Sequence, residues 1–167
     1  MSDVRRFRVV DDSGLIALVD HHAYHGYVSP EWTYETLFAR FRDAMGERQL
    51  LIWGTGREED WIVDVVVGGP APADCFRRAV GPIRVTSGQL HVLSYDSLSM
   101  AAQFDDVRLP EPHRSRQVFD LAPGLYSCDV AQLEDPDYEA TREPHFVLTL
   151  TANYNAEPWQ DPPWHEA

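Results

Sequence analysis

The chain has 167 residues, a formal net charge of −13 and fourteen basic residues, all of them arginine. One domain of this length hides roughly 70% of the surface that its unfolded chain exposes, so the fold needs neither disulfides nor a metal. The acidity excludes nucleic acid as the expected partner, because phosphate binding requires a surplus of cations. No apolar run approaches the ~18 residues of a membrane-spanning helix, and none is typical of a signal peptide. We therefore expect a single cytoplasmic domain over residues 1–167, with no membrane contact.

Two strands are predicted at the start of the chain. Residues 4–10 form the first, with Val4 among the inward-facing positions. The DDSG sequence of residues 11–14 is typical of a turn. Residues 15–19 are apolar at nearly every position, which indicates a strand buried on both faces. We expect these two strands to pair as a hairpin.

Three histidines follow in a short polar segment, at His21, His22 and His25. On a helix His21 and His25 would share a face, and that spacing can bind a metal. No glutamate follows His21 as it does in zinc metallopeptidases, and Gly26 disfavours a long helix here. We therefore expect no bound metal and no other cofactor, with a metal site at these three histidines as the alternative.

One α-helix is predicted over about residues 30–45. Ser29 is suited to cap it, Pro30 favours the first helical position, and Glu31 favours the positive end of the helix dipole. Gly46 is typical of a helix end. Apolar residues recur between these limits at steps of three and four, which predicts a stripe packed on a sheet: Trp32, Leu37, Phe38, Phe41 and Met45.

The next predicted hairpin joins residues 49–53 to residues 61–67. The turn between them, in the sequence WGTGREED, lacks the Gly-Lys-Ser/Thr ending of a phosphate-binding loop. Residues 73–80 are interpreted as a short helix or irregular segment. Residues 97–104 are ambiguous and are treated as a further strand.

The strongest β signal lies in residues 81–134. GPIRVTSGQLHVLS (81–94) alternates on both sides of a Gly turn, which predicts a third hairpin. Residues 116–121 and 124–134 are predicted to pair across Pro123-Gly124. With a last strand at 145–151, about eight to ten strands and one helix predict a mainly β fold, a single-domain β-sandwich or flattened barrel.

No motif in the sequence predicts catalysis. The chain has no GxSxG for a serine nucleophile. Cys75 and Cys128 lack metal-binding spacing, and we interpret both as reduced, small apolar residues. Paired carboxylates occur throughout so acidic a chain and carry no specificity. We therefore expect a protein that is not an enzyme.

The acidic residues concentrate late in the chain. Residues 129–167 hold nine acids and one base, Arg142. Such a surface attracts a basic partner and accelerates their encounter. We therefore predict Asp135, Asp137 and Glu139 as partner-binding residues, with plain solubility as the alternative explanation of the charge.

The C-terminal tail, residues 152–167, is rich in proline and tryptophan, which excludes a regular helix or central strand. We expect it to pack on the body of the domain. Trp159 and Trp164 are also predicted as partner-binding anchors, because tryptophan is enriched at binding hot spots.

The strand pattern of residues 81–134, GPIRVTSGQLHVLS followed by LAPGLYSCDV, resembles the competence-associated nuclease inhibitors and related bacterial toxin-immunity proteins. The resemblance implies a β-sandwich that neutralises a nuclease or another toxin, and it implies no catalytic residues. We therefore interpret the chain as a non-catalytic acidic binding protein, an immunity-type inhibitor of a basic toxin or nuclease. The alternative is a small-molecule- or metal-binding β-sandwich.

Overall fold

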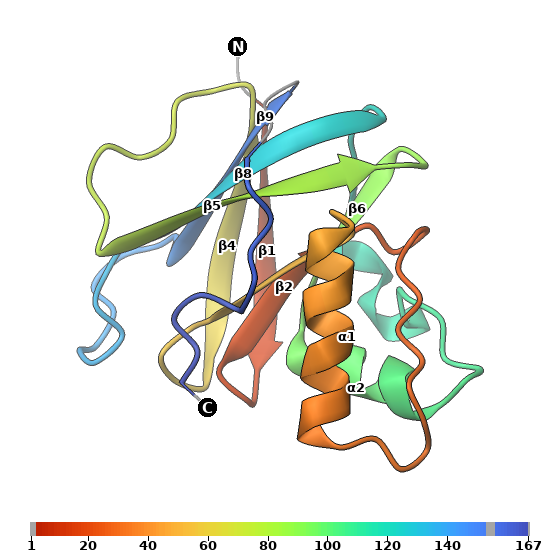
Figure 1. Cartoon of the computed structure of the whole chain (residues 1–167). Helices are drawn as coiled ribbons and strands as arrows, with labels where there is room; N and C mark the ends of the chain where they lie inside the picture. Colours follow the sequence, from red (N-terminus) through yellow and green to blue (C-terminus); the bar gives the residue numbers. More distant parts are fainter. Residues whose placement is uncertain (1–2, 153–155, 167) are drawn as a thin grey trace.

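In the computed structural model, which describes residues 3–152 and 156–166, nine strands form two sheets (Figure 1). The first sheet contains, in spatial order, β1 (Asp3–Asp11), β4 (Glu59–Val67), β9 (Phe146–Ala152), β8 (Gly124–Gln132) and β5 (Arg77–Val85). The second contains β3 (Leu50–Gly54), β2 (Leu15–Val19), β6 (Gln89–Ser94) and β7 (Val118–Asp120). All neighbours are antiparallel except β4 and β9. The mainly β prediction is confirmed, and the sheets form an open sandwich instead of a closed barrel.

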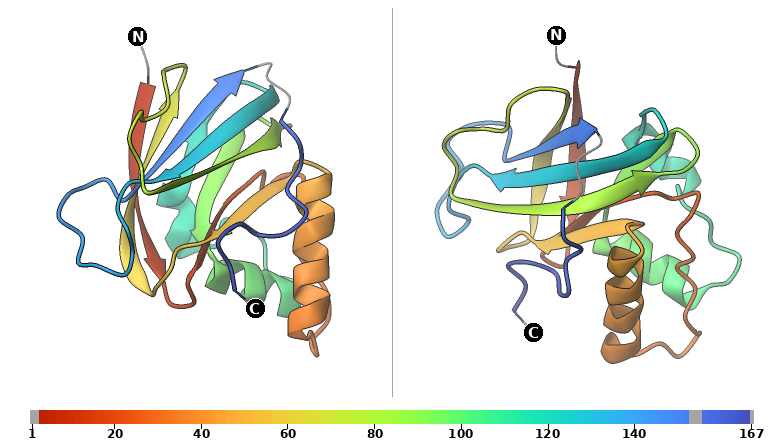
Figure 2. Two further views of the ribbon diagram at one scale, coloured as in Figure 1. Left: turned by 60° about the vertical axis from the view of Figure 1, so that its left-hand side comes forward. Right: turned by 45° about the horizontal axis from the view of Figure 1, so that its top comes forward.

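The second sheet has a core on each of its faces. One cluster lies between the sheets and includes Ile16 and Leu18 of β2. The other lies between the second sheet and the helices, and it includes Leu15, Ala17 and Val19 of the same strand. Figure 2 shows α1 (Tyr34–Gly46) and α2 (Tyr95–Gln103) on this outer side. Burial on both faces explains why β2 is apolar at every position.

All four predicted hairpins are wrong, although their strands are present. In each predicted hairpin, the two strands lie in different sheets. The four pairs are β1 and β2, β3 and β4, β5 and β6, and β7 and β8. The turn residues reverse the chain, but the reversal carries it across the core to the opposite sheet. An alternating pattern specifies which face of a strand is buried. It does not specify the sheet, because strands of both sheets of a sandwich bury one face in the same core.

The predicted helix starts too early in the sequence. α1 begins at Tyr34, because Thr33 caps it and forms a reciprocal capping box with Thr36. The Ser29 hydroxyl instead accepts a hydrogen bond from the Glu31 N–H, 3.1 Å away. The N–H groups of Val28 and Ser29 donate to Ala102, which holds this segment against α2 outside any helix.

Three other predictions need correction. The ambiguous segment at 97–104 belongs to α2, whose buried residues Leu98, Ala101 and Ala102 recur at steps typical of a helix. Residues 77–80 extend β5 as a strand. Val4 is 53% exposed, because it lies on the outward face of β1, opposite the buried Phe7.

Residues 156–166 run along the edge where β5 and β3 are the outermost strands (Figure 1). Trp159 donates its indole N–H to the carbonyl of Val80 in β5 at 2.9 Å. The Gly54 N–H in β3 donates to the carbonyl of Pro163 at 2.8 Å. These contacts occupy backbone groups that an open sheet edge offers to other chains. Residues 153–155 and 167 of the tail lie outside the described residues.

Candidate functional site

The candidate site lies at one end of the sandwich, where several connections meet. The turn after β1, the turn after β3, the start of β5 and the C-terminal segment surround a pocket of about 580 Å³. The long connection between β8 and β9, residues 133–145, forms another wall. We call this connection the acidic loop and the cavity the end pocket. The charged or titratable side chains that line the end pocket are Arg57, Glu58, Arg77, Asp135, Asp137, His165 and Glu166.

The fold brings three of the five predicted partner-binding residues to the end pocket. Asp135, Asp137 and Trp164 all line it. Glu139 is exposed on the same acidic loop, outside the pocket wall. Carboxylates and an aromatic ring therefore share one surface, although nearly thirty positions of sequence separate Trp164 from Asp135 and Asp137.

Trp159 has a different position. Its ring contacts the core clusters on both sides of the second sheet, and its indole N–H is already bonded to Val80. A Cβ atom added to Gly81 would lie only 2.8 Å from the ring. Trp159 therefore joins the C-terminal segment to β5, and it is not among the residues that line the end pocket.

Glu134 holds the two arms of the acidic loop together. Its carboxylate accepts hydrogen bonds from the backbone N–H groups of Thr141, at 3.1 Å, and Arg142, at 3.2 Å, and from the Thr141 hydroxyl. These hydrogen bonds, the Thr141 hydroxyl first, lower the pKa of Glu134. Nearer the tip, the Asp137 N–H donates to the Asp135 carboxylate at 3.0 Å. These hydrogen bonds join the two arms of the loop to each other and order its tip.

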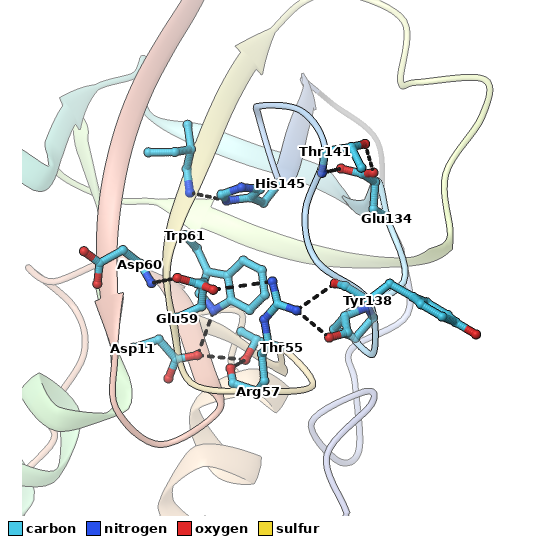
Figure 3. Close-up of polar contacts among 12 residues, drawn as sticks. Asp11, Thr55, Arg57, Glu59, Asp60, Trp61, Glu134, Tyr138, Thr141 and His145 are labelled. Atoms are coloured by element: carbon cyan, nitrogen blue, oxygen red, sulfur yellow. Dashed lines mark hydrogen bonds and ion pairs between the residues drawn. The ribbon is translucent and has the colours of Figure 1, made fainter.

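Arg57 attaches this loop to the body of the domain. Figure 3 shows its guanidinium reaching from the turn after β3 to the loop, where it donates to the carbonyls of Pro136 at 2.7 Å and Tyr138 at 2.8 Å. The same guanidinium lies 3.4 Å from the Glu59 carboxylate and 5.4 Å from the centre of the Trp61 ring. A single arginine thus positions the loop tip that carries Asp137 and Tyr138.

The buried carboxylate of Asp11 holds the turn after β3, which carries Arg57, in place. Asp11 accepts hydrogen bonds from the Thr55 hydroxyl at 2.7 Å and from the Trp61 indole at 2.9 Å (Figure 3). It also accepts the N–H groups of the turn after β1, from Ser13, Gly14 and Leu15. One carboxylate therefore joins both turns that border the end pocket, and all of its donors are neutral groups.

Arg77 forms the cationic part of the end pocket. Its guanidinium lies 4.7 Å from the centre of the Trp164 ring, and its Nε donates to Gln132 at 2.7 Å. Burial lowers the pKa of Arg77, and the nearby Asp135 and Asp137 partly offset that effect. Its Nη2 is buried without a hydrogen-bond partner among the described residues. Arg77 therefore orients the Trp164 ring and faces the acidic loop.

Tyr138, like Arg57 and Arg77, belongs to this surface but was not among the residues predicted from the sequence. It is 72% exposed at the tip of the acidic loop, between the carboxylates of Asp137 and Glu139. Figure 3 shows its side chain pointing away from the body of the domain. Tyrosine is enriched where proteins bind one another, and the sequence DPDYE between two predicted strands was the signal available.

The three histidines of the alternative prediction do not converge on a common point. His22 and His25 are exposed, and His22 lies 3.3 Å from the Gln89 amide oxygen. The His21 ring contacts the rings of His22 and His91, at centroid distances of 4.3 and 5.9 Å. Within residues 3–152 and 156–166, no three His, Cys, Asp or Glu side chains are grouped as metal ligands.

The cysteines and helices add two further observations. Cys128 is fully buried in β8, and burial raises the pKa of its thiol, which disfavours the nucleophilic thiolate. Among the described residues, neither α-helix has the length and apolar character required to cross a bilayer.

The chain is similar to known proteins in its structure and not in its sequence. No family model matches the sequence, and no curated protein sequence matches it. The solved structure of the product of crocagin biosynthetic gene J is 17% identical and has a TM-score of 0.64, over 92% of this chain and 99% of that one. The structure of ComJ from Bacillus subtilis, an inhibitor of the DNA-degrading activity of NucA, is 11% identical and has a TM-score of 0.54, over 91% of this chain and 98% of ComJ. The chain therefore shares its fold with a nuclease inhibitor, as the strand pattern of residues 81–134 led us to expect.

Proposed function

We propose that this protein is a non-catalytic inhibitor that binds a basic protein, of the toxin or nuclease class, with its acidic loop and end pocket. The observation that carries the proposal is the preorganised acidic loop. Five acids and one arginine lie within residues 133–145, and Arg57 and Glu134 hold that segment in one shape. The likeness of fold to ComJ, itself an inhibitor, supports the same function.

In the proposed contact, the carboxylates attract the partner and the aromatic rings anchor it. Asp135, Asp137 and Glu139 attract cationic groups of the partner, as carboxylates that face a basic nucleic-acid-binding groove would. Tyr138 supplies an apolar surface with a polar tip, and Trp164 supplies a second ring in the pocket wall. Because the loop is already ordered, association does not require the cost of ordering it.

The end pocket is suited to a basic side chain of the partner. It is lined by four carboxylates and two guanidinium groups, so its formal charge is negative. Arg57 is bonded to loop carbonyls, and Arg77 is stacked on Trp164. Asp135 and Asp137 lie near Arg77, but no carboxylate of the pocket forms an ion pair with a described residue, so a partner's arginine or lysine could still pair with them. A reducing cytoplasm, in which the free thiols of Cys75 and Cys128 persist, is the proposed location.

The test is capture with matched variants. The loop variant carries Asp135→Asn, Asp137→Asn and Glu139→Gln, which remove three charges and keep the Asp135 oxygen that accepts the Asp137 N–H. The control variant carries Glu47→Gln, Asp105→Asn and Asp106→Asn, three exposed acids outside the acidic loop. We expect a basic protein from the native cell to bind the wild type and the control variant, and to be lost from the loop variant.

The captured protein is then assayed for nuclease or other toxic activity with and without the inhibitor. Inhibition by the wild type and the control variant, reduced in the loop variant, supports the proposal. If every basic protein retained by the wild type is retained equally by the loop variant, the acidic loop is not the binding surface and the charge serves solubility alone.

A further inference from the structure

A second cleft, distinct from the end pocket, is lined by cationic side chains, and no carboxylate is among the described residues of its lining. It has a volume of about 350 Å³ and lies between β1 and the 3-10 helix η1 (Pro112–Gln117). Its charged or titratable side chains are Arg6, Arg8, His113, Arg114 and Arg116. We call it the arginine cleft. Four of the fourteen arginines of a chain with net charge −13 thus surround one small volume.

The fold builds this cleft from two segments that are distant in sequence. β1 is the outermost strand of the first sheet, and β7, which follows η1, is the outermost strand of the second. The Gln117 amide donates to the Arg8 carbonyl at 2.6 Å and joins the two. Beneath this contact, the rings of Phe7 and Phe119 lie 5.7 Å apart in the core. The cleft therefore has a fixed base.

Much of its positive charge forms no ion pair with the residues that the structure describes. The Arg6 guanidinium pairs with the Asp64 carboxylate at 2.8 Å, and the Glu143 carboxylate lies 3.8 Å from the same guanidinium. Arg8 and Arg116 are exposed and make no ion pair with any described residue. Within the same described part of the chain, two buried polar atoms of the lining residues, Arg114 Nε and Gln117 Oε1, also have no hydrogen-bond partner. Arg114 Nε is a donor suited to an anion, whereas Gln117 Oε1 only accepts, so the four arginines of the lining and not these two atoms indicate the kind of ligand.

The positive charge of Arg114 also affects the pKa values of groups in the protein interior. It lowers the pKa of the buried His91, for which burial is the larger cause, and it opposes the rise in the pKa of Asp96 that burial produces. No ion pair joins Arg114 to either residue among those described. Its guanidinium therefore keeps a net positive field in the cleft.

We propose that the arginine cleft binds the phosphate group of a small ligand. Guanidinium groups present planar pairs of N–H donors that match phosphate oxygens, and such charge-assisted bonds are the strong ones. A cleft of about 350 Å³ lies within the size range of small-molecule sites. A long nucleic acid strand is disfavoured, because the acidic surface beyond the cleft repels a polyanion.

The test uses inorganic pyrophosphate as the probe, titrated calorimetrically into the full chain at low ionic strength. The double variant Arg8→Gln with Arg116→Gln is expected to bind it at least about tenfold more weakly than the wild type, because each lost guanidinium removes charge-assisted bonds. The control variant, Arg5→Gln with Arg84→Gln, removes the same charge from exposed arginines outside the cleft and is expected to bind as the wild type does.

A measurement on the wild type alone accompanies the variants. Pyrophosphate is expected to shift the backbone amide resonances of residues 6–8 and 113–117 in NMR spectra. Absence of binding, or equal weakening in both double variants, would overturn the proposal. Binding of a single-stranded oligonucleotide that strengthens with its length, and that pyrophosphate does not displace, would also overturn it in favour of a nucleic acid site.

Discussion

The Arg57 guanidinium donates a hydrogen bond to the backbone carbonyl of Tyr138, 2.8 Å away, across 81 positions of sequence. The contact connects the turn after β3 to the tip of the acidic loop (Figure 3). Since Asp11 fixes that turn from within the core, the exposed Tyr138 is coupled to a buried carboxylate through one arginine. This coupling is the structural basis of the proposed binding surface.

Replacing Arg57 with Gln is expected to loosen the acidic loop without changing its own charges. The variant loses both hydrogen bonds to loop carbonyls, and hydrogen bonds from a charged donor contribute about 1.5–3 kcal/mol each. We expect amide hydrogen exchange within residues 133–145 to accelerate at least about tenfold. Arg84→Gln, at an exposed position of β5, is the control and should leave that exchange unchanged. Equal exchange in both variants would show that the loop is ordered by other contacts.

Asp11 is expected to be a major determinant of stability. Asp11→Ala leaves the Trp61 indole and three backbone donors without their acceptor, while the Thr55 hydroxyl keeps the Arg57 carbonyl at 2.7 Å. We therefore expect a loss of at least about 3 kcal/mol in the free energy of unfolding. Asp11→Asn keeps one oxygen for the backbone donors and is expected to cost about half as much. Urea denaturation of the two variants measures both values. A full loss in Asp11→Ala beside no loss in Asp11→Asn would show that the side chain acts through its volume and not through the hydrogen bonds of its second oxygen.

The buried His91 is expected to make the fold less stable in mild acid. Burial lowers its pKa to about 4, and its Nδ1 lies 3.0 Å from the Gln117 carbonyl, to which the neutral ring can donate. In the unfolded chain its pKa is about 6.5, so between these values the unfolded state binds a proton that the folded state does not. The contribution is complete above about pH 6.5 and is lost progressively as the pH falls towards 4.

At pH 5 this loss amounts to about 2 kcal/mol, from a difference of roughly 1.5 pH units. His91→Asn keeps a donor for Gln117 and removes the titration. Urea denaturation at pH 7.5 and pH 5 should therefore show a smaller decrease in the variant than in the wild type. An identical decrease in both proteins would mean that other groups account for the acid sensitivity.

Gly124 is expected to tolerate no β-branched side chain. Its φ is +151°, which L residues rarely adopt, although a Cβ would meet nothing closer than the Tyr126 ring at 3.9 Å. Gly124→Val should therefore lower the stability by about 1–3 kcal/mol through backbone strain alone. Gly46→Ala provides the contrast, because that position ends α1 with open space around it and alanine favours helix. A melting temperature unchanged by Gly124→Val would contradict the strain argument.

The sequence allowed the strands to be predicted well and their partners poorly. Ile83 and Val85 alternate with polar neighbours and lie in β5, and Leu90 and Val92 lie in β6. Alternation reports only which residues face a core. It does not distinguish a hairpin from a crossing between two sheets, so all four expected hairpins failed for one physical reason.

The candidate site shows a similar division. The local excess of carboxylates identified Asp135 and Asp137, and both line the end pocket. Arg57 could not have been identified, because its role depends on contacts with a loop about eighty residues away. Tyr138 was visible in the sequence, but only the structure showed that its ring is exposed and not part of a core.

The most direct measurement of the central claim is the association kinetics of the captured basic partner with the immobilised protein, at low and at physiological salt. We expect the association rate to fall steeply with salt, since charges in solution are screened over roughly 8–10 Å at physiological ionic strength. The loop variant, Asp135→Asn with Asp137→Asn and Glu139→Gln, should slow association more than it accelerates dissociation, while the control variant behaves as the wild type does. An association rate that depends neither on salt nor on these three carboxylates would contradict the claim that the acidic loop recognises the partner.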